Sequence, residues 1–231
     1  MIPASTESQD PFSKFSSKSF PAHKKNIVSI GWNTTGSMLA SASEDFTIKV
    51  WTLTSSGIDK AYDLKDHTNV VEQIAWHPEN PDILASVSSD KTLKLWDMRA
   101  SKKNIKTAQS KSSILNLAWS PDGKMIAAAT NEDCVAFYDA VSLSSIKQIK
   151  FDREVNAISW NLSGQIFLIA TSSESGLTGP ITVIDGKLLT DIEGLETLDF
   201  HRGRCYCIAM SPKGKYFATG AADALIALWD V

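Results

Sequence analysis

The sequence predicts an all-β fold assembled from five similar units, and three observations support this prediction. Short apolar runs that alternate with polar residues, such as those between Val71 and Trp96, are typical of strands in antiparallel sheets. Turn-forming stretches such as residues 77–82 (HPENPD) separate these runs. The whole pattern then recurs about every 40 to 50 residues, which indicates that each interval forms one supersecondary unit.

Five equivalent positions mark the end of the first strand of each unit. They are Trp32, Trp76, Trp119, Trp160 and Met210. Four residues after each marker we expect a tight turn, because glycine and asparagine tolerate a positive φ there. These turn residues are Gly36, Asn80, Gly123, Gly164 and Gly214. The third strand of each unit is expected to end at Trp51, Trp96, Tyr138, Ile184 or Trp229.

The chain has 231 residues, enough to bury the core of one domain. Residues 1–13 are polar and predict a disordered tail, whereas residues 14–231 predict the repeat domain. Lys14–Phe20 is expected to form a short strand, and residues 171–180 a long turn. The repeats are expected to span residues 20–64, 65–108, 109–150, 151–200 and 201–231.

Composition argues against several classes of protein. The net charge of −3 gives the whole chain no electrostatic attraction to nucleic acid or membranes. We find no apolar run of the roughly 18 residues that a membrane helix needs, and no signal peptide. The three cysteines lack metal-ligand spacing, which favours a reducing compartment. Cys205 and Cys207 are expected to share one strand face as small core residues, the alternative being a redox or metal role.

These repeated positions resemble the WD-repeat family, over about residues 14–231. Several of these positions keep a similar spacing from one repeat to the next. Trp96-Asp97 is the dipeptide expected at the end of a third strand. The resemblance implies a β-propeller whose four-stranded blades cover one another's faces. Dinucleotide-binding and phosphate-binding glycine motifs are absent from the sequence. We therefore expect a protein that is not an enzyme, with no cofactor, metal or small-molecule substrate.

Residues 86–99 (SVSSDKTLKLWDMR), 155–161 (VNAISWN) and 214–231 (GKYFATGAADALIALWDV) are similar to one WD-repeat family in particular, the THO subunits. THO is part of the TREX assembly, which couples transcription to mRNA processing and nuclear export. The resemblance implies a nuclear scaffold whose partners are other THO/TREX subunits, with RNA contacted indirectly through the complex. An alternative is a substrate receptor of a cullin-based ubiquitin ligase, because such receptors carry W-D-x-R strings like residues 96–99.

Propellers of that family have seven blades, and this chain shows five recognisable ones. We therefore expect an incomplete seven-bladed ring that leaves one face of the first blade and one of the fifth uncovered. Two alternatives are closure as an irregular ring of five or six blades, and completion by another chain. By the same resemblance, Lys14–Phe20 is the strand that would close the ring on the last blade.

Histidine, hydroxyl, aspartate and tryptophan residues recur together in repeats one, two and five. The sets are His23, Ser41, Asp45, Trp51; His67, Ser86, Asp90, Trp96; and His201, Thr219, Asp223, Trp229. A Ser–His–Asp combination also occurs in hydrolases, but an active site needs only one copy. The resemblance implies a buried hydrogen-bonded chain that ties the strands of a blade together. Ser110 replaces the histidine in repeat three, while Tyr138 and Ile184 replace the tryptophan in repeats three and four, so we expect these two blades to be less rigid.

One stretch is rich in basic residues and is expected to link repeats two and three. It contains Arg99, Lys102, Lys103, Lys106 and Lys111. Such a run is usually a solvated face, and the alternative is a contact with the RNA backbone or with an acidic partner.

Overall fold

The computed structural model describes residues 19–231 except 56, 101–103, 174–176 and 192–196. The described part contains strands and no helix, which confirms the all-β prediction. The strands form five separate antiparallel sheets, called blades one to five below in chain order. The expected tail, residues 1–13, and most of the expected Lys14–Phe20 strand lie outside the described residues.

Each of the first three blades has four strands, and the strands follow one another in chain order across the sheet. Blade one contains β1 (Ile27–Trp32), β2 (Met38–Ser43), β3 (Ile48–Thr54) and β4 (Gly57–Leu64). Blade two contains β5 (Val71–Trp76), β6 (Ile83–Ser88), β7 (Thr92–Asp97) and β8 (Asn104–Gln109). Blade three contains β9 (Ile114–Trp119), β10 (Met125–Thr130), β11 (Cys134–Asp139) and β12 (Ser145–Lys150).

The last two blades have three strands each among the described residues. Blade four contains β13 (Val155–Trp160), β14 (Ile166–Thr171) and β15 (Ile181–Asp185). Blade five contains β16 (Cys205–Met210), β17 (Tyr216–Ala221) and β18 (Ile226–Asp230). Among the described residues beyond β15, two isolated bridges pair the chain with blade four, Ile181 with Leu198 and Ile184 with Asp191. The expected turn between residues 171 and 180 connects β14 to β15.

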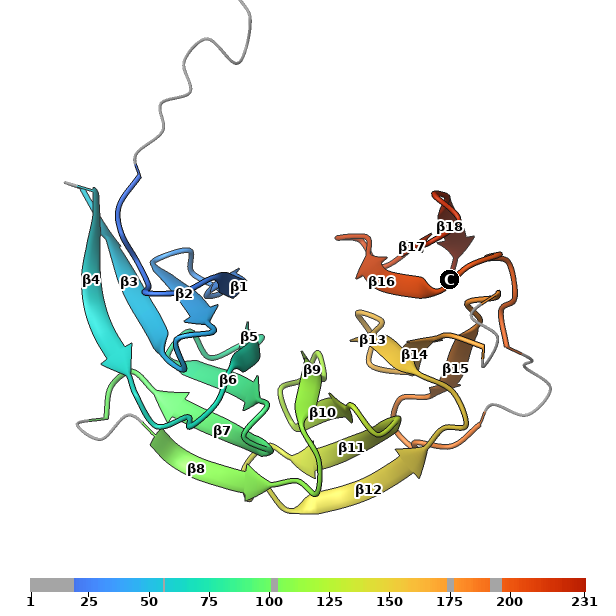
Figure 1. Cartoon of the computed structure of the whole chain (residues 1–231), viewed down its shortest axis with the longest axis horizontal. Coiled ribbons are helices and arrows are strands. Elements are labelled where there is room, and N and C mark those ends of the chain that lie inside the picture. The colour runs from blue at the N-terminus through green and yellow to red at the C-terminus, as the bar shows by residue number, and fades with distance from the viewer. Residues whose placement is uncertain (1–18, 56, 101–103, 174–176, 192–196) are drawn as a thin grey trace, which may run out of the picture.

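The five blades form an open arc (Figure 1). Strands β1, β5, β9, β13 and β16 line the inside of the arc, and β4, β8 and β12 lie along its outside. Consecutive inner strands contact one another from blade one to blade five. The arc is open between blade one and blade five, so one face of each of these two blades has no neighbouring blade.

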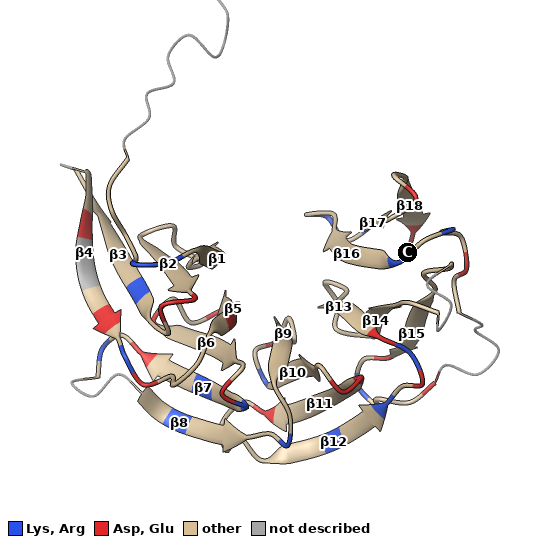
Figure 2. Cartoon of the chain, viewed as in Figure 1, with Lys and Arg blue, Asp and Glu red and all other residues tan. Residues whose placement is uncertain are grey.

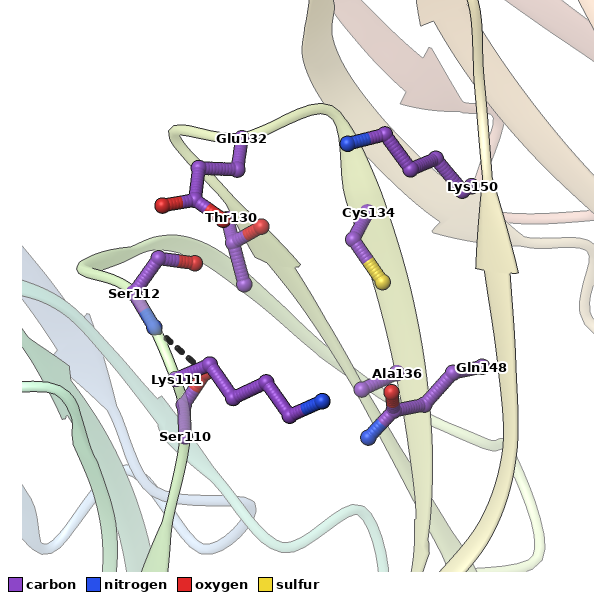
Figure 3. A pocket seen from close by; sticks show the side chains of 9 residues that line it. All are labelled: Ser110, Lys111, Ser112, Thr130, Glu132, Cys134, Ala136, Gln148 and Lys150. Carbon is purple, nitrogen blue, oxygen red and sulfur yellow. Dashed lines mark hydrogen bonds between the residues drawn. The ribbon is translucent and has the colours of Figure 1, made fainter.

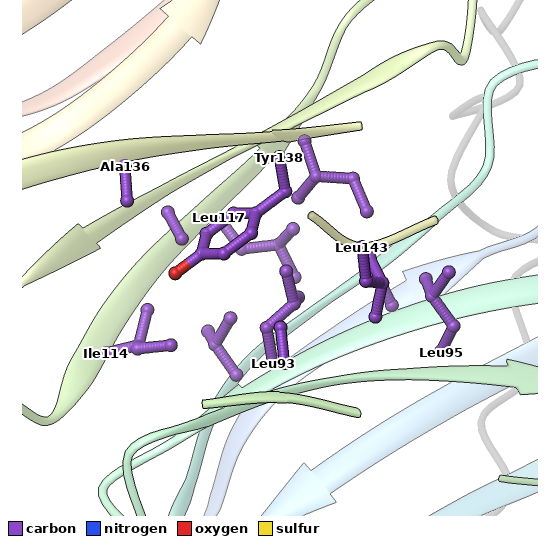
Figure 4. Close-up of a cluster of buried hydrophobic side chains, with 12 residues drawn as sticks. Leu93, Leu95, Ile114, Leu117, Ala136, Tyr138 and Leu143 are labelled. Carbon is purple, nitrogen blue, oxygen red and sulfur yellow. The ribbon is translucent and has the colours of Figure 1, made fainter. Parts of the chain in front are cut away.

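The hydrophobic core lies between consecutive blades, because the apolar side chains of each sheet pack on the next sheet. On β11, Val135 and Phe137 pack against blade four, while Ala136 and Tyr138 pack against blade two. A strand buried on both faces needs apolar residues at nearly every position, which explains the sequence CVAFYD. Figure 4 shows the cluster between blades two and three, including Leu93, Leu95, Ile114, Leu117, Ala136, Tyr138 and Leu143.

Tryptophans at the ends of the inner strands also join neighbouring blades by hydrogen bonds. The Nε1–H of Trp76 donates to the carbonyl oxygen of Gly31 in blade one at 2.8 Å. In the same way, Trp119 donates to the carbonyl oxygen of Ala75 in blade two at 3.0 Å. Trp76 and Trp119 therefore help to fix the lateral position of one blade on the next.

The glycine prediction for the first turn of each repeat is confirmed in four blades. Gly36, Gly123, Gly164 and Gly214 have φ values of 67°, 67°, 70° and 70°. The prediction is wrong for Asn80, which is not among the described residues with positive φ. The turn of blade two holds Pro81 directly after Asn80, and a following proline favours an extended backbone. The Asn80 side chain instead accepts a hydrogen bond from the Asp82 amide at 3.1 Å.

The expected closing strand stays a prediction, because its residues 14–18 lie outside the described part of the chain. Ser19 and Phe20, the described residues there, are not part of a strand. The Phe20 ring packs on Trp51 of blade one, with 4.9 Å between ring centroids. The apolar Phe20 ring therefore has a contact on blade one.

Candidate functional site

The polar set of blade two brings together residues from four separate segments. His67 precedes β5, Ser86 lies on β6, Asp90 follows β6 and Trp96 lies on β7. His67 lies 2.7 Å from Ser86 Oγ through Nε2 and 2.7 Å from Asp90 Oδ2 through Nδ1. The Trp96 indole donates to Ser86 Oγ at 2.8 Å. Because Trp96 can only donate, the Ser86 hydroxyl is free to donate to His67 Nε2, which leaves the proton of Nδ1 for Asp90.

The sets of blades one and five have the same arrangement. In blade one the distances are 2.8 Å for His23–Ser41, 3.0 Å for His23–Asp45 and 3.2 Å for Trp51–Ser41. In blade five they are 2.8 Å for His201–Thr219, 3.1 Å for His201–Asp223 and 2.9 Å for Trp229–Thr219. The structure therefore brings together all three sets that the sequence singles out.

The aspartate of each set also accepts a backbone hydrogen bond from the segment before the first strand. The amides of Lys24, Thr68 and Arg202 donate to these carboxylates at 2.9, 3.0 and 2.9 Å. Burial alone would raise the pKa of Asp90, but hydrogen bonds from His67, Thr92 and the Thr68 amide outweigh it and hold that pKa well below its usual range. Asp45 has a lowered pKa in the same way, since its hydrogen bonds outweigh the effect of burial.

The hydroxyl groups of the sets are poorly placed to act as nucleophiles. Ser41, Ser86 and Thr219 are 3%, 0% and 2% exposed. Each hydroxyl oxygen already accepts a hydrogen bond from a tryptophan indole. A hydrolytic serine must be reachable by a substrate, so this burial argues against the hydrolase interpretation.

Blades three and four lack the polar set, and its position is occupied by apolar side chains in blade four but is a cavity in blade three. In blade four, Phe151 and Ile169 stand at the positions of the histidine and the hydroxyl residue and belong to the apolar cluster against blade three. Counting nine residues back from Trp160 would have identified Phe151 in the sequence. Blade three contains a cavity at this place, with Ser110 in its wall.

The expected basic linker proves to contain a strand of blade two. β8 occupies residues 104–109 and pairs with β7, so the prediction that the whole stretch links two blades is wrong. The apolar Ile105 and Ala108 within the stretch allow it to form a regular outer strand. Lys102 and Lys103 lie outside the described residues.

The described basic residues of this stretch have different contacts and do not form one basic patch. Arg99 pairs with Asp97 at 2.9 Å and lies 3.6 Å from Asp82. Lys106 donates to the carbonyl oxygen of Val141 in blade three. Lys111 lies beyond the other end of β8 from Arg99, roughly 20 Å away along the six-residue strand. Figure 2 accordingly shows lysine and arginine spread over several blades.

Cys205 and Cys207 do not share a face, so this prediction is wrong. A β-bulge between them shifts the register of β16 on β17. Cys205 is fully buried, which raises the pKa of its thiol to about 11, whereas Cys207 is exposed. Among the described residues we find no cluster of three His, Cys, Asp or Glu side chains able to hold a metal ion. The described part likewise has no helix suited to crossing a membrane.

Comparisons with known proteins agree with this repeat architecture. The family described as "WD domain, G-beta repeat" matches residues 14–52 and 193–230, and the "Anaphase-promoting complex subunit 4 WD40 domain" matches residues 74–163. A THO complex subunit 3 from Arabidopsis thaliana is 38% identical over 227 residues, covering 97% of this chain and 69% of that protein. The chain belongs to the WD-repeat family.

Two further comparisons cover nearly the whole chain. The WD repeat-containing protein AAC3 of Dictyostelium discoideum is 34% identical over 242 residues, covering 95% of this chain and 49% of that protein. The human serine-threonine kinase receptor-associated protein is 25% identical over 212 residues, covering 90% of this chain and 56% of that protein. A WD-repeat scaffold role is therefore supported, and the chain spans only part of each of these relatives.

Proposed function

We propose that this chain is a non-enzymatic WD-repeat scaffold in a nuclear complex of the THO type. The observation that carries the proposal is the 38% identity to a THO complex subunit 3, which extends over 97% of this chain. A likeness over the whole repeat domain includes the loops and outer strands where propellers bind other proteins. The partners proposed are the other subunits of THO/TREX, with a role in coupling transcription to mRNA processing and export and with RNA contacted indirectly.

In this proposal the three polar sets hold the scaffold in shape and take no part in chemistry. Each set ties a loop before the first strand to the second and third strands of the same blade. The repetition of one geometry in blades one, two and five supports a structural role, because the strands must be joined in the same way in each of these blades. The burial of the three hydroxyls supports it as well.

The ubiquitin-ligase alternative receives no support from Arg99. In the W-D-x-R string of this chain, the Arg99 guanidinium forms a two-pronged contact with Asp97. The Nε and one Nη of Arg99 lie 3.0 and 2.9 Å from the two carboxylate oxygens. Pairing within the same chain weakens the case for a ligase adaptor at this residue.

Affinity purification from nuclear extract tests the proposal. A tagged form of the full chain, expressed in its own cells, should recover the helical THO subunits in mass spectrometry. Recovery of a cullin adaptor in their place would support the ligase alternative and contradict the proposal. Recovery of neither would also contradict it, provided that the tagged chain is present in the nucleus.

A further inference from the structure

Blade three contains a cavity of about 430 Å³ at the place where blades one, two and five hold a polar set. Its lining comes from the loop after β8, from the end of β10 and the turn that follows it, and from strands β11 and β12. They are Ser110, Lys111, Ser112, Thr130, Glu132, Cys134, Ala136, Gln148 and Lys150. Figure 3 shows these side chains surrounding a common space. Ala136 also belongs to the core cluster against blade two, so the cavity lies on that side of blade three.

Replacements of large side chains by small ones account for this cavity. Strand register places Ala128 opposite Ala136, as it places Ser86 opposite Lys94 in blade two. Ser110 takes the place of the histidine, so blade three lacks both the imidazole and the long lysine side chain. Blade four lacks the histidine too, but there Phe151 and Ile169 pack in an apolar cluster. Loss of the set therefore does not by itself produce a polar cavity.

A buried hydroxyl without a partner points into this cavity. Thr130 is 5% exposed, and its Oγ1 forms no hydrogen bond with the described residues. Ser88, the equivalent residue of blade two, donates to the carbonyl oxygen of Val70 at 2.7 Å. Figure 3 shows the Thr130 hydroxyl turned toward Cys134 and the space between the strands. A buried polar group is normally satisfied, so this hydroxyl indicates a ligand atom or water in the cavity.

The charges around the cavity are mixed, with an excess of positive charge. Lys111 and Lys150 supply two cations, and neither forms an ion pair with another described residue. Glu132 supplies the one carboxylate of the lining. Burial raises the pKa of the Cys134 thiol, so this side chain is neutral at pH 7. The Gln148 amide and the hydroxyls of the lining add further hydrogen-bond donors.

We propose that the blade-three cavity binds the carboxylate of an aspartate or glutamate side chain presented by a partner protein. Two lysines against one glutamate leave one positive charge, which a single carboxylate neutralises. A phosphate group carries a charge of about −1.5 to −2, which is larger than this single net positive charge. Glu132 would also repel it. The cavity is large enough for one side chain, and its rim residues Lys111, Glu132 and Lys150 are exposed to an approaching partner. This site does not depend on membership of a THO-type complex.

Cys134 provides a reporter inside the cavity. In a Cys207→Ser variant, the partly exposed Cys134 is the accessible thiol, because Cys205 is fully buried. The rate of its alkylation by iodoacetamide is measured on the purified full chain with a blocked pentapeptide that has one central glutamate. We expect saturable protection, reaching about tenfold at a peptide concentration ten times its Kd. Shifts of the Thr130 and Cys134 amide signals in NMR give a second readout that does not depend on thiol chemistry.

Matched variants and peptides decide the result. Lys111→Gln and Lys150→Gln should each weaken the peptide by about three- to tenfold, with rates normalised to the same variant without peptide. Lys124→Gln, on the exposed turn after β9, should have no effect. Ser110→His together with Ala128→Ser should fill the cavity and abolish protection in a chain that remains folded.

Several outcomes would overturn the proposal. Equal protection by the matching glutamine peptide would show that the carboxylate is not recognised. No protection and no NMR shift with the glutamate peptide would show that the cavity does not bind it. Stronger protection by inorganic phosphate would assign the cavity to a phosphate group. Equally strong protection by free glutamate would assign it to a small acid and not to a segment of a protein.

Discussion

Asp90 holds together parts of blade two that are more than twenty positions apart in sequence. It accepts hydrogen bonds from His67 and from the Thr68 amide before β5, and its other oxygen lies 2.6 Å from the Thr92 hydroxyl. Because the set is largely buried, its hydrogen bonds are strong. For the same reason, a residue of the set that loses its partner destabilises the fold. The contribution of a polar set to stability therefore depends on all of its members being present.

We predict that Asp90→Ala lowers the free energy of unfolding by about 1–3 kcal/mol, because it leaves the buried His67 and Thr92 without their acceptor. Chemical denaturation of the purified chain measures this difference. Glu132→Ala is the matched control, since Glu132 stands at the equivalent position in blade three, where no histidine is present. The control should change stability by no more than about 0.5 kcal/mol. Equal effects of the two substitutions would contradict the structural role of the set.

Stability should also fall in acid, because Asp45 and Asp90 have lowered pKa values in the folded chain. The unfolded chain takes up these protons first as the pH decreases, so the stabilisation is complete above the ordinary aspartate pKa of about 4 and is lost below it. We expect the thermal midpoint to decrease from pH 5 toward pH 2.5. The double variant Asp45→Asn, Asp90→Asn should show a weaker dependence, and an equally steep decrease in this variant would refute the assignment.

At the scale of strands and blades, tryptophans of the inner strands join neighbouring blades by hydrogen bonds, which add to the apolar packing between those blades. Trp76 and Trp119 each donate to a carbonyl of the preceding blade, whereas Trp32, on the open side of blade one, is 50% exposed. The same residue in the same register thus has a different environment according to its place in the arc.

We predict that Trp76→Phe lowers the free energy of unfolding by about 0.5–1.5 kcal/mol through loss of the bond to Gly31, with a further loss from reduced packing. Trp32→Phe serves as the comparison and should change stability by about 0.5 kcal/mol or less. Thermal unfolding of both variants gives the difference. A larger loss in Trp32→Phe would mean that the open side of blade one is covered in solution.

Most of the strands could be predicted from the sequence, because alternation and a repeated frame report on local geometry. The hydrogen bonding of the three polar sets was predicted from the resemblance to the WD-repeat family. The failures concern contacts that repetition does not determine. Pro81 changed the turn at Asn80, a β-bulge separated Cys205 from Cys207, and β8 occupies part of the expected linker. The cavity of blade three was missed for the same reason. Its shape depends on Ala128 and Ala136 lying opposite each other across β10 and β11.

At the scale of the whole molecule, the two ends of the arc expose apolar side chains. Ile30 on β1 is 67% exposed, and on β18 Ile226 and Leu228 are 81% and 70% exposed. Their counterparts in blade two, Ile74, Leu93 and Leu95, are covered by a neighbouring blade. Open apolar faces and unpaired strand edges of this kind favour association with other protein surfaces.

We predict that the purified 231-residue chain self-associates through these faces. Size-exclusion chromatography with light scattering should give a mass above that of the monomer, increasing with concentration. Ile226→Lys together with Leu228→Lys should shift the distribution toward the monomer. A wild-type monomer with a single sharp thermal transition would mean that the chain closes on itself, which would contradict the open arc.

Direct reconstitution tests the proposed scaffold function most decisively. The purified chain is mixed with the purified helical subunits of a THO complex, and the mixture is analysed by size-exclusion chromatography with light scattering. The account predicts co-elution in a single complex of defined stoichiometry, with the chain drawn out of its self-associated form. Separate elution of the chain and the THO subunits, under conditions in which those subunits assemble with their own WD-repeat subunit, would contradict it.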